Sequence, residues 1–162
     1  MLQEKQETML QEKQETNLGT NTFFLRNQVP TILAIGAHPD DIEVGCGGTL
    51  KVLADLGYKV YGVILTDGEK GGDREKRLKE ASTSARILGL ENVFFEHMED
   101  GNIPFNIETV TAIEKYIRKF QPQKVFTHTK QDRHQDHWAC SGATQAAARK
   151  GVKEILMYEI YG

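Results

Sequence analysis

The order in which strand-like and helix-like segments follow one another constrains this fold more than any other feature of the sequence. Short apolar runs, as expected of buried strands, alternate with longer segments whose apolar residues recur at helical spacing. We predict strands at residues 31–36, 59–65, 93–95, 124–128 and 154–158, with helices between them at 49–56, 74–88, 107–120 and 136–150. This alternation predicts an α/β fold, a Rossmann-like three-layer sandwich in which helices cover both faces of a mostly parallel sheet.

The size and charge of the chain narrow the classes of protein to which it can belong. Its 162 residues, 39% hydrophobic and 27% charged, are typical of a soluble globular domain. A net charge of −3 without a basic stripe argues against a nucleic-acid partner. No apolar run approaches the roughly 20 residues needed to span a bilayer, and the N-terminus does not resemble a signal peptide. Cys46 and Cys140 lack CxxC spacing, which fits a reducing compartment, and we expect a cytoplasmic location.

The beginning of the chain differs from the rest. Residues 1–8, MLQEKQET, are repeated without change at 9–16. This stretch carries too few apolar groups to pack firmly. We therefore expect residues 1–22 to be a disordered polar segment and residues 23–162 to form a single folded domain.

Two clusters of histidine and carboxylate residues follow strands of the predicted sheet. The first, HPDD at 38–41, follows the strand at 31–36, and the second, DRHQDH at 132–137, follows the strand at 124–128. In parallel sheets, ligands bind beyond the carboxyl ends of the strands, at the point where the strand order reverses. If these two strands are neighbours at that point, the two clusters converge on one site.

Convergence of the clusters would assemble the ligands of a catalytic metal. A catalytic zinc takes three protein ligands, commonly His with Asp or Glu, and leaves one position for water. His38, Asp41 and His137 would supply such a set. Zinc can lower the pKa of a bound water to about 7, and the neighbouring Asp40 could then accept the proton that the water releases.

A further pair of residues in the second cluster suits the later steps of a hydrolysis. A protonated His134, oriented by Asp136, could stabilise a developing oxyanion or protonate a leaving amine. Both residues belong to the same six-residue DRHQDH motif as His137. We therefore expect His134 and Asp136 to be catalytic.

Each cluster also has a purely structural alternative. HPDD alone could be a turn whose aspartates cap the next helix, and DRHQDH alone could be a solvated loop. Their joint occurrence at equivalent strand ends favours a site. His97 and His128 are expected to be structural or pocket-lining, with His128, at a strand end, the stronger candidate for a role. The string GCGGT at 45–49 matches neither GxGxxG nor GK[ST], so we expect its glycines to permit close packing of the helix.

The two motifs together resemble the PIG-L/LmbE-like family of zinc-dependent N-deacetylases, which remove acetyl groups from N-acetylglucosamine-type amino sugars. AHPDDIEVGCGGTL and DRHQDH carry the resemblance, which extends over roughly residues 30–158 and includes TDGE at 66–69 and an RxxE pair. It implies an LmbE-like fold and a role for each matching residue. The zinc ligands would be His38, Asp41 and His137, and Asp40 would be the general base. His134, beside Asp136, would be the acid or electrostatic histidine. Arg77 and Asp100 would bind the substrate.

The resemblance also implies the reaction and the partners. The expected activity is hydrolysis of the acetamide of a small N-acetylated amino sugar or glycoconjugate, with Zn²⁺ as cofactor, although Fe²⁺ or another divalent ion could use the same ligands. A homo-oligomer is compatible with this assignment. The chain departs from the family pattern at Ile42, which stands where a glutamate is usual, and at YEIYG, where relatives continue. We therefore expect the domain to be incomplete at its C-terminus.

Three other functions remain open at the level of sequence. A metal-dependent esterase or phosphoesterase would use the same residues around the metal. A sugar- or metal-binding module without turnover would follow if the missing C-terminal elements are needed for catalysis. A nucleotide-binding Rossmann-type domain is disfavoured because the GxGxxG fingerprint is missing.

Overall fold

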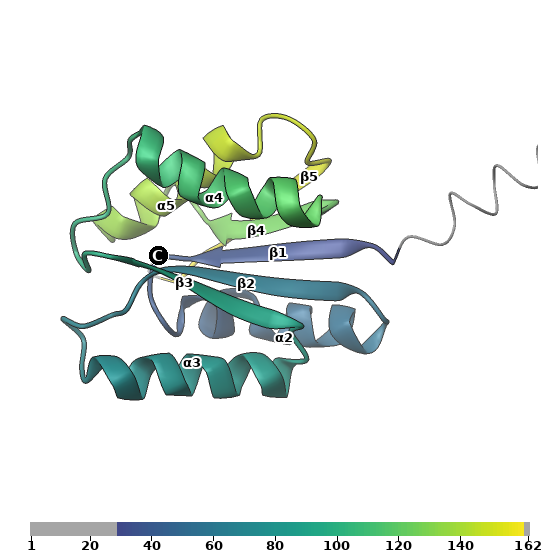
Figure 1. Cartoon of the computed structure of the whole chain (residues 1–162), viewed down its shortest axis with the longest axis horizontal. Coiled ribbons are helices and arrows are strands. Elements are labelled where there is room, and N and C mark those ends of the chain that lie inside the picture. Colours follow the sequence, from purple (N-terminus) through teal and green to yellow (C-terminus); the bar gives the residue numbers. More distant parts are fainter. Residues whose placement is uncertain (1–28, 161–162) are drawn as a thin grey trace, which may run out of the picture.

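The computed structural model describes residues 29–160. Within this range, strands and helices alternate along the chain in the predicted order (Figure 1). The elements are β1 (Thr31–Gly36), α2 (Asp41–Asp55), β2 (Lys59–Thr66), α3 (Arg74–Leu88), β3 (Asn92–Met98), α4 (Ile107–Phe120), β4 (Lys124–His128), α5 (Gln135–Ala147) and β5 (Glu154–Tyr158). The N-terminal segment predicted at 1–22 lies outside the described residues.

The strands form one sheet in the order β3-β2-β1-β4-β5. Each neighbouring pair is parallel, which confirms the predicted α/β fold with a mostly parallel sheet. The chain places β2 and β3 on one side of β1 and then β4 and β5 on the other. The strand order therefore reverses between β1 and β4, and these two strands are direct neighbours.

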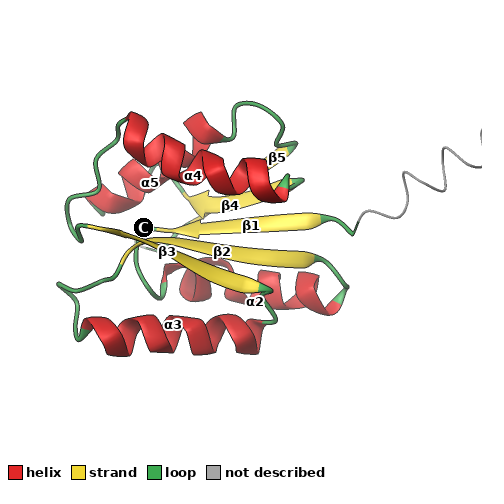
Figure 2. Cartoon of the chain, viewed as in Figure 1, coloured by secondary structure: helices red, strands yellow, loops and turns green. Residues whose placement is uncertain are grey.

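Helices cover both faces of the sheet, as Figures 1 and 2 show. Helices α2 and α3 lie on one face, and α4 and α5 lie on the other. Alternate side chains of a strand point to opposite faces, so the buried β1 contributes to both cores. Leu33 and Ile35 belong to the core under α4 and α5, whereas Ile32 and Ala34 belong to the core under α2 and α3.

Helix α2 begins at Asp41, well before the start predicted at Thr49. The glycines between these positions conceal the helix in the sequence because glycine disfavours helix interiors. Packing against a neighbouring element explains one of them. A Cβ added at Gly45 would lie 2.1 Å from the ring of Tyr158, whereas one at Gly47 would be in ordinary contact with Leu88 at 3.5 Å. The expectation that the glycines permit close packing is therefore supported at Gly45 and not at Gly47 or Gly48.

Two other boundaries differ from those predicted. Strand β3 runs from Asn92 to Met98 and not only over 93–95, because its half-exposed edge position leaves no clear apolar pattern in the sequence. Helix α5 ends at Ala147, before the predicted residue 150. Among residues 29–160, the structure contains no helix with the length and apolar character needed to cross a membrane.

Candidate metal centre

The candidate site lies beyond the carboxyl ends of β1 and β4, in the turns that lead into α2 and α5. The first turn is closed by Asp41, whose Oδ2 accepts the backbone N–H of His38 at 2.7 Å. The second is closed by Asp132, whose Oδ1 accepts the backbone N–H of His134 at 3.0 Å. Because β1 and β4 are adjacent, the two clusters converge as the sequence predicted.

The three predicted metal ligands present their donor atoms to one another. One donor atom each from His38, Asp41 and His137 lies within 4.8 Å of the other two. Oδ1 of Asp41 is 3.4 Å from Nε2 of His137, and its Oδ2 is 3.4 Å from Nδ1 of His38. Ligands bound at about 2.0–2.1 Å to a tetrahedral zinc lie about 3.4 Å apart. The donor types therefore suit a zinc ion, and each histidine lies at about this separation from one oxygen of Asp41.

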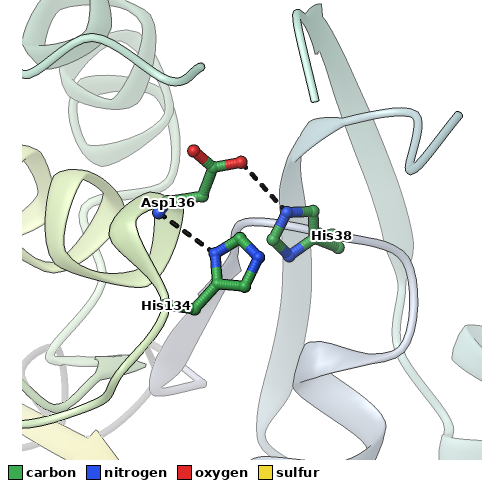
Figure 3. Close-up of side chains that lie close together, drawn as sticks. All are labelled: His38, His134 and Asp136. Carbon is green, nitrogen blue, oxygen red and sulfur yellow. Dashed lines mark hydrogen bonds and ion pairs between the residues drawn. The ribbon is translucent and has the colours of Figure 1, made fainter. Parts of the chain in front are cut away.

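Both histidines of this set have carboxylates behind them. Nδ1 of His137 lies 2.9 Å from Oδ2 of the buried Asp132. Nε2 of His38 lies 3.1 Å from Oδ2 of Asp136 (Figure 3) and 3.2 Å from Oδ1 of Asp100. A carboxylate behind a ligating histidine fixes the ring and raises its basicity. The sequence did not single out Asp132 for this role; its place at the start of DRHQDH was the available signal.

His128 supports the site from the end of β4. Its Nε2 lies 3.1 Å from Oδ2 of Asp41, and its ring stacks on that of His137 with centroids 3.9 Å apart. The hydroxyl of Tyr158 donates to the carbonyl of Ile35 at 2.7 Å and lies beside His128. The expectation that His128 is the more important of the two remaining histidines agrees with this placement. His97, by contrast, lies near the end of β3, where its Nδ1 is 2.7 Å from Oδ1 of Asp67.

Two further groups of side chains have donor atoms close enough to hold a metal. One comprises His38, His134 and Asp136; the other comprises His128, Asp132 and His137. Each shares a histidine with the set centred on Asp41. Among the ion pairs within residues 29–160, Asp41 is paired with both shared histidines, through separate carboxylate oxygens. For this reason we treat His38, Asp41 and His137 as the candidate centre.

Burial and hydrogen bonding set the charges of the cluster. Burial disfavours ionised Asp41, but hydrogen bonds from His128, His137 and His38 hold its pKa well below the ordinary value. Burial likewise disfavours charged His38, yet its contacts with Asp136 and Asp41 raise its pKa to about 10. Without a metal, the cluster therefore pairs a cationic His38 with an anionic Asp41. A metal cation bound at this centre would replace the proton on Nδ1 of His38, the nitrogen that faces Asp41.

The structure relates His134 and Asp136 differently from the sequence interpretation. The backbone N–H of Asp136 donates to Nδ1 of His134 at 3.2 Å, as Figure 3 shows. The carboxylate of Asp136 instead contacts Nε2 of His38 and accepts hydrogen bonds from the backbone N–H groups of Gly101 and Ile103. Burial and the positive charge of His38 lower the pKa of His134. In the metal-free protein His134 is thus neutral, its proton on Nε2, and the backbone of Asp136 orients it.

Asp40 and Arg77 lie at the open side of the site. The side chain of Asp40 is 66% exposed, and its Oδ2 accepts a hydrogen bond from Nη2 of Arg77 at 3.1 Å. Both residues line a cavity of about 410 Å³ between α2 and α3, together with Glu43, Lys76, Glu80 and Ser84. Asp100, expected to bind substrate, is buried behind His38.

Most of the sequence matches a known protein family. Residues 33–148 match the PIG-L family, described as GlcNAc-PI de-N-acetylase. The chain belongs to this family. The match spans β1 to the end of α5 and contains both motifs of the candidate metal centre.

Individual relatives of this PIG-L family chain include deacetylases. It is 36% identical over 140 residues to a protein of Escherichia coli K12 named uncharacterized deacetylase YaiS, covering 82% of this chain and 75% of YaiS. Among solved structures, it matches the N,N′-diacetylchitobiose deacetylase of Pyrococcus horikoshii at 31% identity with a TM-score of 0.71. It also matches the 4-carboxy-2-hydroxymuconate hydratase of Pseudomonas putida KT2440 at 27% identity with a TM-score of 0.69.

The matches to the two enzymes of known structure are partial. They cover 74% of this chain in both cases, but only 49% of the Pyrococcus deacetylase and 56% of the Pseudomonas hydratase. The chain therefore spans about half the length of these two enzymes.

Proposed function

We propose that this protein is a metal-dependent deacetylase that removes the acetyl group from an N-acetylglucosamine-type amino sugar or a conjugate of one. The observation that carries the proposal is the cluster of His38, Asp41 and His137, whose donor atoms are of the types that bind zinc and lie within 4.8 Å of one another. The deacetylase names of the relatives support the choice of reaction.

The proposed cofactor is a zinc ion held by these three residues. Bound there, the metal would lower the pKa of water and polarise the carbonyl of the substrate. Two imidazoles and one carboxylate also suit Fe²⁺ and other divalent ions, so the ion in the cell depends on availability as well as on the ligands. The paired carboxylates behind His38 and His137 would keep both rings in the orientation for binding.

Asp40 is the proposed general base. It directly precedes the ligand Asp41, and its carboxylate is exposed to the cavity in which a substrate would bind. A carboxylate so placed can take the proton of the attacking water and later deliver it to the leaving amine. Although its side chain is largely exposed, partial desolvation and the charge of Asp41 favour protonation of Asp40, Arg77 opposes it, and the net result is a raised pKa.

His134 is the proposed donor to the oxyanion. Its Nδ1 accepts the N–H of Asp136, which leaves the proton on Nε2 available to a substrate oxygen. The ring of His134 lies 4.8 Å from that of His38 and 4.7 Å from that of His137, centroid to centroid. A neutral histidine beside the metal ligands can stabilise the negative charge that develops on the carbonyl oxygen.

The cavity between α2 and α3 is lined by Asp40 but by none of the three proposed metal ligands, and the proposal is that a hydroxyl-rich substrate extends into it from the metal centre. Its volume of about 410 Å³ falls within the usual range for small-molecule sites. Charged groups of both signs line it, among them Glu43, Lys76, Arg77 and Glu80. Such groups donate to and accept from sugar hydroxyls, which supports a small amino sugar in preference to an apolar acyl compound.

The test is acetate release by the purified, zinc-loaded protein from N-acetylglucosamine and N,N′-diacetylchitobiose. We expect turnover of at least one of them, lost on Asp40→Asn and kept on Asp55→Asn, a matched change at an exposed aspartate of α2. Zinc binding without acetate release from these sugars or their conjugates would contradict the proposed reaction and favour a binding module. Equal activity of Asp40→Asn and wild type would contradict the role of Asp40.

A second candidate is hydration of an unsaturated carboxylic acid, favoured by the likeness to the Pseudomonas hydratase. Both reactions need a metal site and a base, so the substrate distinguishes them. Loss of the ultraviolet absorbance of 4-carboxy-2-hydroxymuconate, without acetate release from any N-acetyl sugar, would favour the hydratase. Adding an acetate ester and a phosphate ester to these substrates tests the esterase and phosphoesterase alternatives.

We also propose that the protein functions in a reducing compartment such as the cytoplasm. Cys46 and Cys140 are both free and buried. Burial raises the pKa of each thiol to about 12, so both behave as small core residues and not as reactive thiolates.

A further inference from the structure

The backbone at Asp40 is strained. Asp40 has φ of 114° and ψ of −24°, a left-handed conformation that residues other than glycine seldom adopt. Its side chain does not cap α2, although it occupies the N-cap position. Strained residues of this kind persist only where their surroundings hold them in place. Some other group must therefore keep this turn in position.

Arg77 adds two contacts to the hydrogen bond by which Asp41 closes this turn. Its Nη2 donates to the backbone carbonyl of Pro39 at 2.5 Å and to Oδ2 of Asp40 at 3.1 Å. It reaches the turn from α3, and its side chain is only 18% exposed. Nη2 of Arg77 thus bridges the backbone of Pro39 and the side chain of Asp40.

The loop between β2 and α3 leaves space for this guanidinium. A Cβ added at Gly68 would lie 2.7 Å from Nε of Arg77, and one added at Gly71 would lie 2.2 Å from Nη1. Gly68 has φ of +66°, so its backbone favours glycine in any case. Gly71 is different, because its backbone is not in the left-handed region. The guanidinium of Arg77 is the nearest group that would meet a side chain at position 71.

We propose that Arg77 is a positioning residue, which holds Asp40 in its strained turn and is itself held in place by the close approach of Gly71. The proposal rests on the proposed role of Asp40 as general base. It differs from the expectation that Arg77 acts by contacting the substrate. A positioning residue affects the chemical step, whereas a substrate contact made equally in the ground state and the transition state affects KM.

Gly71→Ala tests the proposal without changing Asp40 or Arg77. The added methyl group would displace the guanidinium, which sits at the end of a flexible side chain, so the fold should tolerate the change. We expect kcat for acetate release to fall by about 10- to 100-fold with KM changed by less than about twofold, because small misplacements of a catalytic group are costly. Gly48→Ala is the control, since among residues 29–160 a Cβ at that helical position would meet no atom within 4 Å apart from its chain neighbours and the adjacent backbone of its own helix.

Variants at position 77 complete the test. Arg77→Ala should show the same loss of kcat, and adding Gly71→Ala to it should cause no further loss, because the two changes remove the same contact. Arg77→Lys should recover part of the activity, since one ammonium group can reach Asp40 but cannot reproduce the planar guanidinium. A raised KM with unchanged kcat, or additive losses in the double variant, would overturn the proposal.

Thermal unfolding of the metal-free variants separates this proposal from the proposed function. Gly71→Ala should lower the Tm when Arg77 is present and leave it unchanged in the Arg77→Ala background. Equal lowering in both backgrounds would overturn the contact between Gly71 and Arg77. If the wild-type protein releases no acetate, the proposed function fails, yet the unfolding measurement still decides whether Arg77 is seated on Gly71.

Discussion

Asp40 and Asp41 are neighbours in sequence, yet they occupy opposite environments. Asp41 is buried and contacts three histidines, whereas the Asp40 side chain is two-thirds exposed and contacts Arg77. The difference follows from the turn: the left-handed backbone at Asp40 directs its side chain outward, and the helix begins at the next residue. Two identical carboxyl groups can therefore serve separate functions.

The first prediction is that substitutions at these two aspartates fail in different ways. Asp41→Ala should reduce bound zinc from about one ion per chain to almost none, because it removes a ligand. Asp40→Ala should keep its zinc and lose about 10²-fold or more in kcat, the usual contribution of a general base. Elemental analysis after gel filtration, run beside the acetate assay, measures both effects. Loss of zinc from the Asp40 variant would contradict this division of roles.

A second prediction concerns Asp132, the carboxylate behind His137. Asp132→Asn keeps the size of the side chain but weakens its hold on Nδ1 of the ring. We expect the affinity for zinc to fall by about 10- to 100-fold, as is usual when such partners of a metal ligand are changed. Competition with a chromophoric chelator measures this affinity. Asp73→Asn, a change at the exposed N-cap of α3, is the control and should leave it unaltered.

At the scale of secondary-structure elements, the sequence predicted the order of strands and helices but not the start of α2. Propensity and periodicity act locally, and Gly45, Gly47 and Gly48 are poor helix formers by both criteria. Packing against Tyr158 and Leu88 overrides them, and this packing depends on residues distant in sequence. The same reason explains why the support given by Asp132 was not foreseen.

The third prediction tests the packing of α2 on β5. Gly45→Ala places a methyl group against the ring of Tyr158, whose hydroxyl is already committed to the carbonyl of Ile35. Overpacking of this kind costs about 1–3 kcal/mol. Urea unfolding of the metal-free protein should show that loss, whereas Gly48→Ala should be neutral or slightly stabilising. Equal stabilities of the two variants would mean that α2 does not approach Tyr158 closely.

At the scale of the whole molecule, the predicted topology was sufficient to bring the two motifs together. Parallel strands place their carboxyl ends at one edge, and the order β3-β2-β1-β4-β5 puts the reversal between the two motif-bearing strands. The direction of each side chain within the turns could not be predicted, because it depends on contacts across the site. The carboxylate of Asp136, which lies on His38 and not on His134, is the clearest example.

The fourth prediction is that zinc stabilises the entire fold. A ligand that binds only the folded state at 100 times its Kd adds about 2.7 kcal/mol, which for a chain of this size raises the Tm by roughly 5–10 °C. The rise should be absent in Asp41→Ala. Mg²⁺ should have little effect, because it prefers oxygen ligands in octahedral geometry. A zinc-dependent rise of equal size in Asp41→Ala would place the bound ion elsewhere.

The reversal of strand order between β1 and β4 also has a consequence for synthesis of the chain. His38 and Asp41 leave the ribosome early, whereas β4 and His137 follow only after β2, β3 and the three helices α2, α3 and α4 have been made. A nascent chain thus carries two ligands of the set without the third. The intervening segment must close as one long loop before all three can meet. Metal binding at the proposed centre would consequently be a late event, possible only once both halves of the sheet have joined.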